Sequence, residues 1–281
     1  MTMPFRRGDG RDLPVLVVVH AHPDDESSST GGTLARYAAL GHRTVLVTCT
    51  DGRLGDAADG AKPGQPGHDP DEVARRRALE LDDAAAILGV SEVVKLGYPD
   101  SGVDADGAPD AFSRRPMAPM VEQLAGLLRL HRPDVVITYP PNGLSGHPDH
   151  IRTHDVVAAV HRDLVAEGEA PRLYYVALSR SRVKALQDHI EDAVGDDGFA
   201  PPDDMAVDDD TITTVIDVEP YWQAKLAGLA AHSSQADAAM LLQMFSLLAD
   251  VAAGTHRVEE YVRAFPLVTG TEPGIERDLF R

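Results

Sequence analysis

Residues 14–26 read PVLVVVHAHPDDE, and this stretch decides the fold. Its first part, Pro14 to His20, is almost wholly apolar, which is typical of a parallel strand buried on both faces of a sheet. Its second part changes abruptly to histidines and carboxylates around Pro23. A polar cluster directly after a buried strand predicts a turn at the carboxyl end of that strand, where open α/β sheets bind their ligands.

Further strands and helices alternate along the chain, which favours a Rossmann-like α/β fold. Strands are expected at 43–50, 92–96, 134–139, 172–178 and 211–218, the last of these being the final strand. Helices are expected at 30–40, 71–88, 116–131, 149–167, 220–231 and 237–252. Stretches rich in glycine, proline or acidic residues predict irregular segments at 51–69, 99–115 and 192–210, and in the tail from 265.

The expected domain organisation is one domain over residues 1–281. Its core covers about 14–180, and about 181–281 completes the pocket. We predict a mostly parallel sheet with helices on both faces and an active site at the C-terminal strand ends.

Composition excludes several classes of protein. The formal net charge is −19, so the surface repels nucleic acids and anionic membranes. Cys49 is the only cysteine, and the longest apolar run is far too short to span a bilayer. Residues 1–12 do not resemble a signal peptide, so a cytoplasmic protein is expected. Oligomeric state stays open, with a homo-oligomer as one expectation.

The first polar cluster is a candidate metal site. His22 and Asp25 are three residues apart across a turn that begins at Pro23, so both can face one ion. A nitrogen and a carboxylate oxygen suit zinc. The alternative is a polar helix cap, in which Asp24 or Asp25 accepts hydrogen bonds from the following helix. His20 still belongs to the strand and is interpreted as a packed histidine.

A second cluster follows the strand at 134–139. Residues 140–150 read PPNGLSGHPDH, again a strand end that opens into histidine and aspartate before a helix. If the two strands flank the switch point of the sheet, His150 supplies a third ligand and leaves a position for water. His154 lies one helical turn further on, but no glutamate follows His150, so His154 is interpreted as structural.

With both clusters in view, the chain resembles the LmbE-like (PIG-L-type) zinc-dependent N-deacetylases. The matching motifs are His-Pro-Asp-Asp-Glu at 22–26, His-Pro-Asp-His at 147–150 and His-Ser-Ser-Gln at 232–235, the last preceded by Lys225. The similarity covers about residues 14–245. Within the family it is nearest to the actinobacterial branch that contains the mycothiol deacetylase and the mycothiol S-conjugate amidase.

The resemblance implies a set of roles. His22, Asp25 and His150 would bind Zn²⁺, with Fe²⁺ as the alternative metal. Asp24 would be the general base, and His147 would stabilise the oxyanion and protonate the leaving amine. Asp149 would orient His147 and hold it protonated.

One position departs from the family pattern. The mycothiol deacetylase has a tyrosine where this chain has Ser145, so another group takes that role or the substrate binds differently. Arg53, Asp100 and Ser101 are expected to contact sugar hydroxyls because they lie in loops after strands.

The expected substrate is a small N-acyl amino sugar, cleaved by a metal-dependent hydrolase. A mycothiol S-conjugate amidase or a natural-product glycoside deacetylase is the alternative, and a non-catalytic sugar-binding module is the remote one.

Overall fold

A computed structural model describes residues 13–103, 109–195, 199–247, 257–267 and 274–281. Parts of four expected segments lie outside these residues: the loop 99–115, the excursion 192–210, the end of the helix 237–252 and the tail. The N-terminal residues 1–12 also lie outside them.

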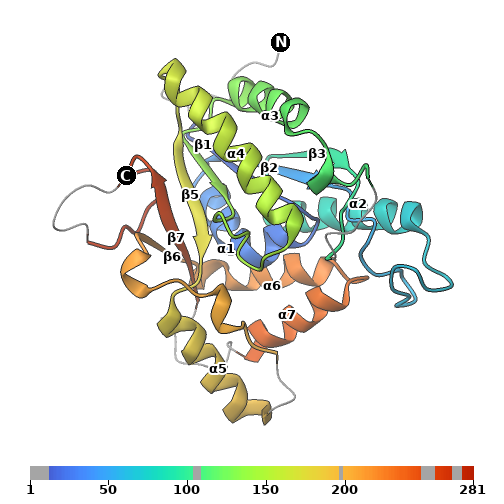
Figure 1. Cartoon of the computed structure of the whole chain (residues 1–281). Helices are drawn as coiled ribbons and strands as arrows, with labels where there is room; N and C mark the ends of the chain where they lie inside the picture. Colours follow the sequence, from blue (N-terminus) through green and yellow to red (C-terminus); the bar gives the residue numbers. More distant parts are fainter. Residues whose placement is uncertain (1–12, 104–108, 196–198, 248–256, 268–273) are drawn as a thin grey trace.

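A seven-stranded sheet forms the centre of the molecule, in the order β3-β2-β1-β4-β5-β7-β6 (Figure 1). The first five strands in this order are parallel, and β7 is antiparallel to both of its neighbours. The expected mostly parallel α/β sheet is therefore confirmed. The strands are β1 (Val15–His20), β2 (Arg43–Thr50), β3 (Glu92–Tyr98), β4 (Val135–Thr138), β5 (Arg172–Ala177), β6 (Thr214–Asp217) and β7 (Val258–Phe265).

Helices cover both faces of this sheet, as expected. On one face, α1, α2 and α6 pack on the side chains of Leu16, Val18 and Leu46. On the other, α3 and α4 pack on Val17 and Val47, which point the opposite way because strand side chains alternate. The helices are α1 (Asp25–Ala39), α2 (Pro70–Ile87), α3 (Met117–His131), α4 (Pro148–Glu167), α5 (Arg180–Val194), α6 (Trp222–Ala231) and α7 (Ala236–Leu247).

Three expectations about elements were wrong. The strand ending at Asp217 is not the last, because β7 follows it and inserts between β5 and β6. Helix α5 was not expected at all. Helix α1 begins at Asp25 rather than Thr30, so the first polar cluster runs directly into a helix. The serines at 27–29 concealed this first turn. Further along α1, Gly32 is required because a Cβ there would lie 2.5 Å from Val218.

The order of the strands places the two polar clusters together. β1 pairs with β4, and the next neighbours of this pair, β2 and β5, lie on opposite sides. The chain therefore leaves β1 and β4 at the switch point of the sheet, which was the expected location of the site. Within the residues that the structure describes, we found no helix long and apolar enough to cross a membrane.

Candidate metal centre and active site

The turn after β1 is held in an uncommon backbone conformation. Asp24 has φ 100°, in the left-handed region that side chains rarely adopt. The backbone N–H of Asp24 donates to Glu26, and the N–H of His22 donates to Asp25 at 2.8 Å. These bonds fold the turn back on itself, so that His22 and Asp25 face the same space.

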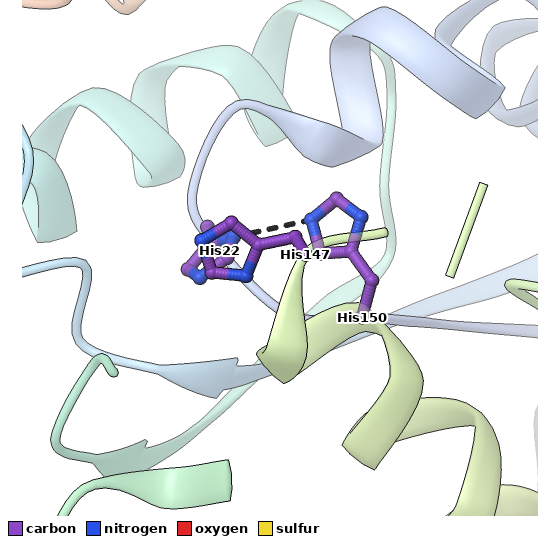
Figure 2. A group of neighbouring side chains, drawn as sticks. All are labelled: His22, His147 and His150. Carbon is purple, nitrogen blue, oxygen red and sulfur yellow. Dashed lines mark hydrogen bonds between the residues drawn. The ribbon is translucent and has the colours of Figure 1, made fainter. Parts of the chain in front are cut away.

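Donor atoms of three residues converge at this point from two distant parts of the chain. His22 Nδ1 lies 3.3 Å from His150 Nε2 and 3.4 Å from Asp25 Oδ2, and His150 Nε2 lies 3.4 Å from Asp25 Oδ1. Figure 2 shows the His22 and His150 rings approaching each other. Ligand atoms of a tetrahedral ion at about 2.0–2.1 Å lie about 3.3–3.4 Å apart, so this spacing fits zinc.

The second ring nitrogen of each histidine contacts another group of the protein. His150 Nδ1 lies 3.0 Å from the carbonyl oxygen of Gly143, and His22 Nε2 lies 3.2 Å from Asp149 Oδ2. Partners of this kind fix the orientation of a metal-binding imidazole and the nitrogen that it presents. Asp25 Oδ2 accepts a hydrogen bond of 2.7 Å from the hydroxyl of Tyr139. The residues present therefore fit a divalent cation.

Carboxylates surround His22 and favour positive charge there. Besides Asp149, Asp100 Oδ1 lies 3.5 Å from His22 Nε2. Burial lowers the pKa of His22, but Asp100 and Asp149 outweigh burial and raise that pKa well above its ordinary value. Burial likewise opposes ionisation of Asp25, yet His150 and His22 hold the pKa of Asp25 well below its usual range. Two other donor sets also lie within 4.8 Å: His22 with His147 and His150, and His22 with Asp100 and Asp149. The latter uses Nε2 of His22 rather than Nδ1.

His147 lies beside the centre at the start of α4. Its ring packs edge-on against the His22 ring, with centroids 4.5 Å apart (Figure 2), and its Nδ1 accepts the backbone N–H of Asp149 at 3.1 Å. Nε2 is thus the ring nitrogen that carries a proton. Burial, followed by the neighbouring His22 and His150, lowers the pKa of His147 to about 4.

The Asp149 side chain is directed at partners other than His147 in the structure. The Asp149 carboxylate accepts from Ser101 N at 2.9 Å and contacts His22, while only the backbone of Asp149 bonds His147. Helix geometry explains this, because a residue two positions after an N-cap points its side chain away from the cap.

Arg77 is a residue of this site that the sequence did not reveal. From α2 it donates to the carbonyl oxygens of Gly52 and Pro23 and to Asp24 Oδ2 at 2.9 Å. Burial raises the pKa of Asp24, against the opposing effect of Arg77, to about 6. Arg77 is the last of three consecutive arginines, and such a run is typical of an exposed helix face.

The third motif, residues 232–235, contacts the turn after β1 through Glu26. His232 Nε2 lies 2.7 Å from Glu26 Oε1, and both side chains are fully buried. Glu26 in turn accepts from the backbone of Asp24. Gln235 accepts from the backbone of Asp56 and so ties the loop after β2 to the same support. This motif positions the first cluster and contributes no donor atom to the three described above.

The residues expected to contact the substrate lie at different distances from the metal centre. Asp100 and Ser101 lie at the centre, through their bonds to His22 and Asp149. Arg53 is half-buried and paired with Asp51 at 2.7 Å. Ser145 is exposed, and its hydroxyl lies 3.4 Å from His150 Nδ1, too far for a strong hydrogen bond.

Comparison with known proteins assigns the family. The profile described as "PIG-L: GlcNAc-PI de-N-acetylase" matches residues 17–161, which contain both metal-site clusters. The chain belongs to the PIG-L family. The family match ends within α4, so the third motif and the strands β5 to β7 lie beyond it.

One curated relative and two solved structures of similar fold are informative. A 1D-myo-inositol 2-acetamido-2-deoxy-alpha-D-glucopyranoside deacetylase from Actinosynnema mirum is 37% identical, over 95% of this chain and 96% of that protein. The N,N'-diacetylchitobiose deacetylase of Pyrococcus horikoshii superposes with a TM-score of 0.60 at 18% identity, covering 90% of this chain and 84% of that one. A 4-carboxy-2-hydroxymuconate hydratase from Pseudomonas putida gives 0.64 at 19% identity, covering 92% and 100%. The fold alone therefore does not define the reaction.

Proposed function

We propose that this PIG-L protein is a metal-dependent amidohydrolase that removes the N-acyl group from a small amino sugar. The observation that carries the proposal is the convergence of His22 Nδ1, the Asp25 carboxylate and His150 Nε2, with distances of 3.3–3.4 Å between them. Asp24, the proposed base, directly precedes Asp25 in the sequence. Relatives about 37% identical over nearly the whole chain are named as deacetylases of an acetamido sugar attached to inositol.

The proposed cation is Zn²⁺, held by His22, Asp25 and His150, with Fe²⁺ as the alternative. When bound, such an ion lowers the pKa of a coordinated water to about 7 and polarises the substrate carbonyl. Tyr139 orients Asp25 by donating to Oδ2.

The residues around the ion would move the protons. Asp24 Oδ2 is bonded to Arg77, which leaves Oδ1 to accept the proton of the attacking water. His147 Nε2 carries a proton that it can donate in a hydrogen bond to the carbonyl oxygen, and Asp24 would pass the proton taken from the water to the departing nitrogen. The water oxygen joins the acyl carbon, the C–N bond breaks, and the products are a carboxylate and a free amine.

The test is hydrolysis of 1D-myo-inositol 2-acetamido-2-deoxy-alpha-D-glucopyranoside. The enzyme is stripped with a chelator, reloaded with zinc or ferrous iron, and assayed for equal amounts of acetate and primary amine. We expect turnover with metal and none without it. Loss of turnover in Asp24→Asn, with the exposed Asp59→Asn as control, supports the role of the base. Absence of amide hydrolysis by the reloaded enzyme on acetylated sugars and on mycothiol S-conjugates would overturn the proposal.

A further inference from the structure

A largely apolar cavity of about 190 Å³ opens beside the candidate metal centre. Asp25 and His150, two of the proposed ligands, form part of its wall. The opposite wall comes from α5, α6 and α7 and from the ends of β5 and β7, the region at the bottom of Figure 1. Its apolar lining includes Leu144, Val176, Leu186, Phe199, Met244 and Phe245.

Most charged side chains in the far wall are bonded within the protein. Lys225 pairs with Glu259 at 2.6 Å, and Glu260 accepts from the backbone and hydroxyl of Ser179. Arg182 also lines the cavity, and its guanidinium could pair with a carboxylate at the end of an acyl chain such as succinyl. A ligand in this space therefore meets mainly hydrophobic surface.

Four polar residues of the site lie outside the cavity wall. Asp24, Asp100, Ser101 and His147 do not contribute to the cavity wall. In the proposed function Asp24 returns its proton to the departing amine, so the sugar that carries this amine lies beside Asp24 rather than in the cavity. The acyl half of the amide then points past Asp25 and His150 into the cavity.

We infer that the cavity binds the acyl chain, and that the enzyme prefers N-acyl amino sugars whose acyl group is longer than acetyl. This inference rests on the proposed function. An apolar cavity of about 150 Å³ holds a benzene molecule, so the single methyl group of an acetyl would leave most of this space empty. Each methylene transferred from water into it should raise kcat/KM about fourfold until the cavity is full.

The first test is a series of methyl glucosaminides with N-acetyl, N-butanoyl and N-hexanoyl groups, assayed with the metal-loaded enzyme. We expect kcat/KM to rise along the series, and a fall would overturn the inference. Lengthening the aglycone from methyl to octyl on the N-acetyl substrate should have a smaller effect, and a larger one would assign the cavity to the aglycone. Faster hydrolysis of an N-succinyl than of an N-butanoyl substrate would show that Arg182 selects a carboxylate, and would also overturn it.

The second test fills the cavity. Leu241 lines it from α7, whereas its neighbour Leu242 is equally half-buried but does not. Leu241→Trp should reduce the preference for hexanoyl over acetyl at least about tenfold, and Leu242→Trp should retain it, with thermal melts confirming that both fold. An unchanged preference in Leu241→Trp would contradict the inference. If that variant does not fold, Met244→Ala should shift the optimum to longer chains.

The two proposals fail in different ways. If the acetyl substrate is hydrolysed and kcat/KM falls as the acyl chain lengthens, the proposed function stands and the acyl site is refuted. Absence of hydrolysis for every amide removes the proposed function itself.

Discussion

The hydroxyl of Tyr139 donates a 2.7 Å hydrogen bond to Asp25, across the boundary between the two polar clusters. The same oxygen accepts the backbone N–H of Ala21 at 2.9 Å, and it lies 3.1 Å from His20 Nδ1. Tyr139 therefore links the end of β4 to the turn after β1, and it explains why His20 is a packed histidine rather than a metal ligand.

Removing this hydroxyl tests whether it supports the metal. Tyr139→Phe should weaken zinc binding about 10–100-fold, because Asp25 loses the group that orients it. The measurement is competition with a chromophoric chelator. Tyr174→Phe is a matched control, since its buried hydroxyl bonds Leu279 and Glu276 away from the centre. Equal zinc affinity in wild type and Tyr139→Phe would show that the bond is only structural.

The identity of the third ligand can be tested on one helix. His150→Ala should lower zinc affinity more than about 100-fold, since even partners behind a ligand contribute 10–100-fold. His154→Ala, one turn further along α4, should retain the metal, because His154 Nδ1 contacts the Tyr139 carbonyl instead. Metal content after gel filtration distinguishes the two, and the reverse order of affinities would exchange the two roles.

Asp24 is expected to act on turnover rather than on metal binding. Asp24→Asn should retain zinc and lower kcat about 10²–10⁴-fold, which is the usual contribution of a general base. Steady-state kinetics together with metal analysis of the same sample provide the measurement. Full activity in this variant would remove Asp24 from the mechanism.

Arg77 holds the turn that presents Asp24. Arg77→Met leaves the carbonyl oxygens of Pro23 and Gly52 and the Asp24 carboxylate without this donor. We expect a loss of about 3–5 kcal/mol in the free energy of unfolding, measured with urea, and a lower kcat. The exposed Arg75→Met serves as the control. A stable Arg77→Met enzyme with unchanged kcat would contradict the positioning role.

The buried pair of His232 and Glu26 makes stability depend on pH. Burial lowers the pKa of His232, but Glu26 outweighs burial and raises it above 6.5. The stabilisation from this histidine is therefore complete below pH 6.5, and it is lost as pH rises through the higher folded-state value. His232→Gln should flatten the fall in the free energy of unfolding as pH rises above 6.5.

His161→Gln is the control for that experiment. Burial lowers the pKa of His161, so its charge differs between the folded and unfolded states mainly below and around pH 6.5, and it adds little slope at higher pH. Parallel pH curves for wild type and His232→Gln would show that the pair does not titrate in this range.

The sequence predicted the parallel sheet and the meeting of His22, Asp25 and His150. Both depend on local signals, namely apolar strands and the polar turns that end them. It did not predict β7, because the charged Glu259 occupies a buried position on the same face of the strand as Tyr261. The alternation of apolar and polar residues that marks a strand is therefore broken. Glu259 is tolerated there because it binds Lys225 and the N–H groups of Gly32 and Thr33.

Arg77 and the orientation of Asp149 could not be predicted for a related reason. Which arginine of the run 75–77 turns inward depends on the rotation of α2 against the sheet, and only Arg77 is buried. Asp149 faces His22 rather than His147 because of the direction in which α4 leaves its cap. Such choices are made by packing between distant elements, which leave no local pattern.

The late position of β7 has a consequence for synthesis on the ribosome. A growing chain can complete β1, β4 and α4 while Glu259, which holds the backbone of α1, is still inside the exit tunnel. Until that strand emerges, the edge of β5 is open to pairing with other chains. Nascent polypeptides halted before residue 258 should therefore depend on chaperones to avoid aggregation, and the catalytic pocket should form only after β7 has left the ribosome.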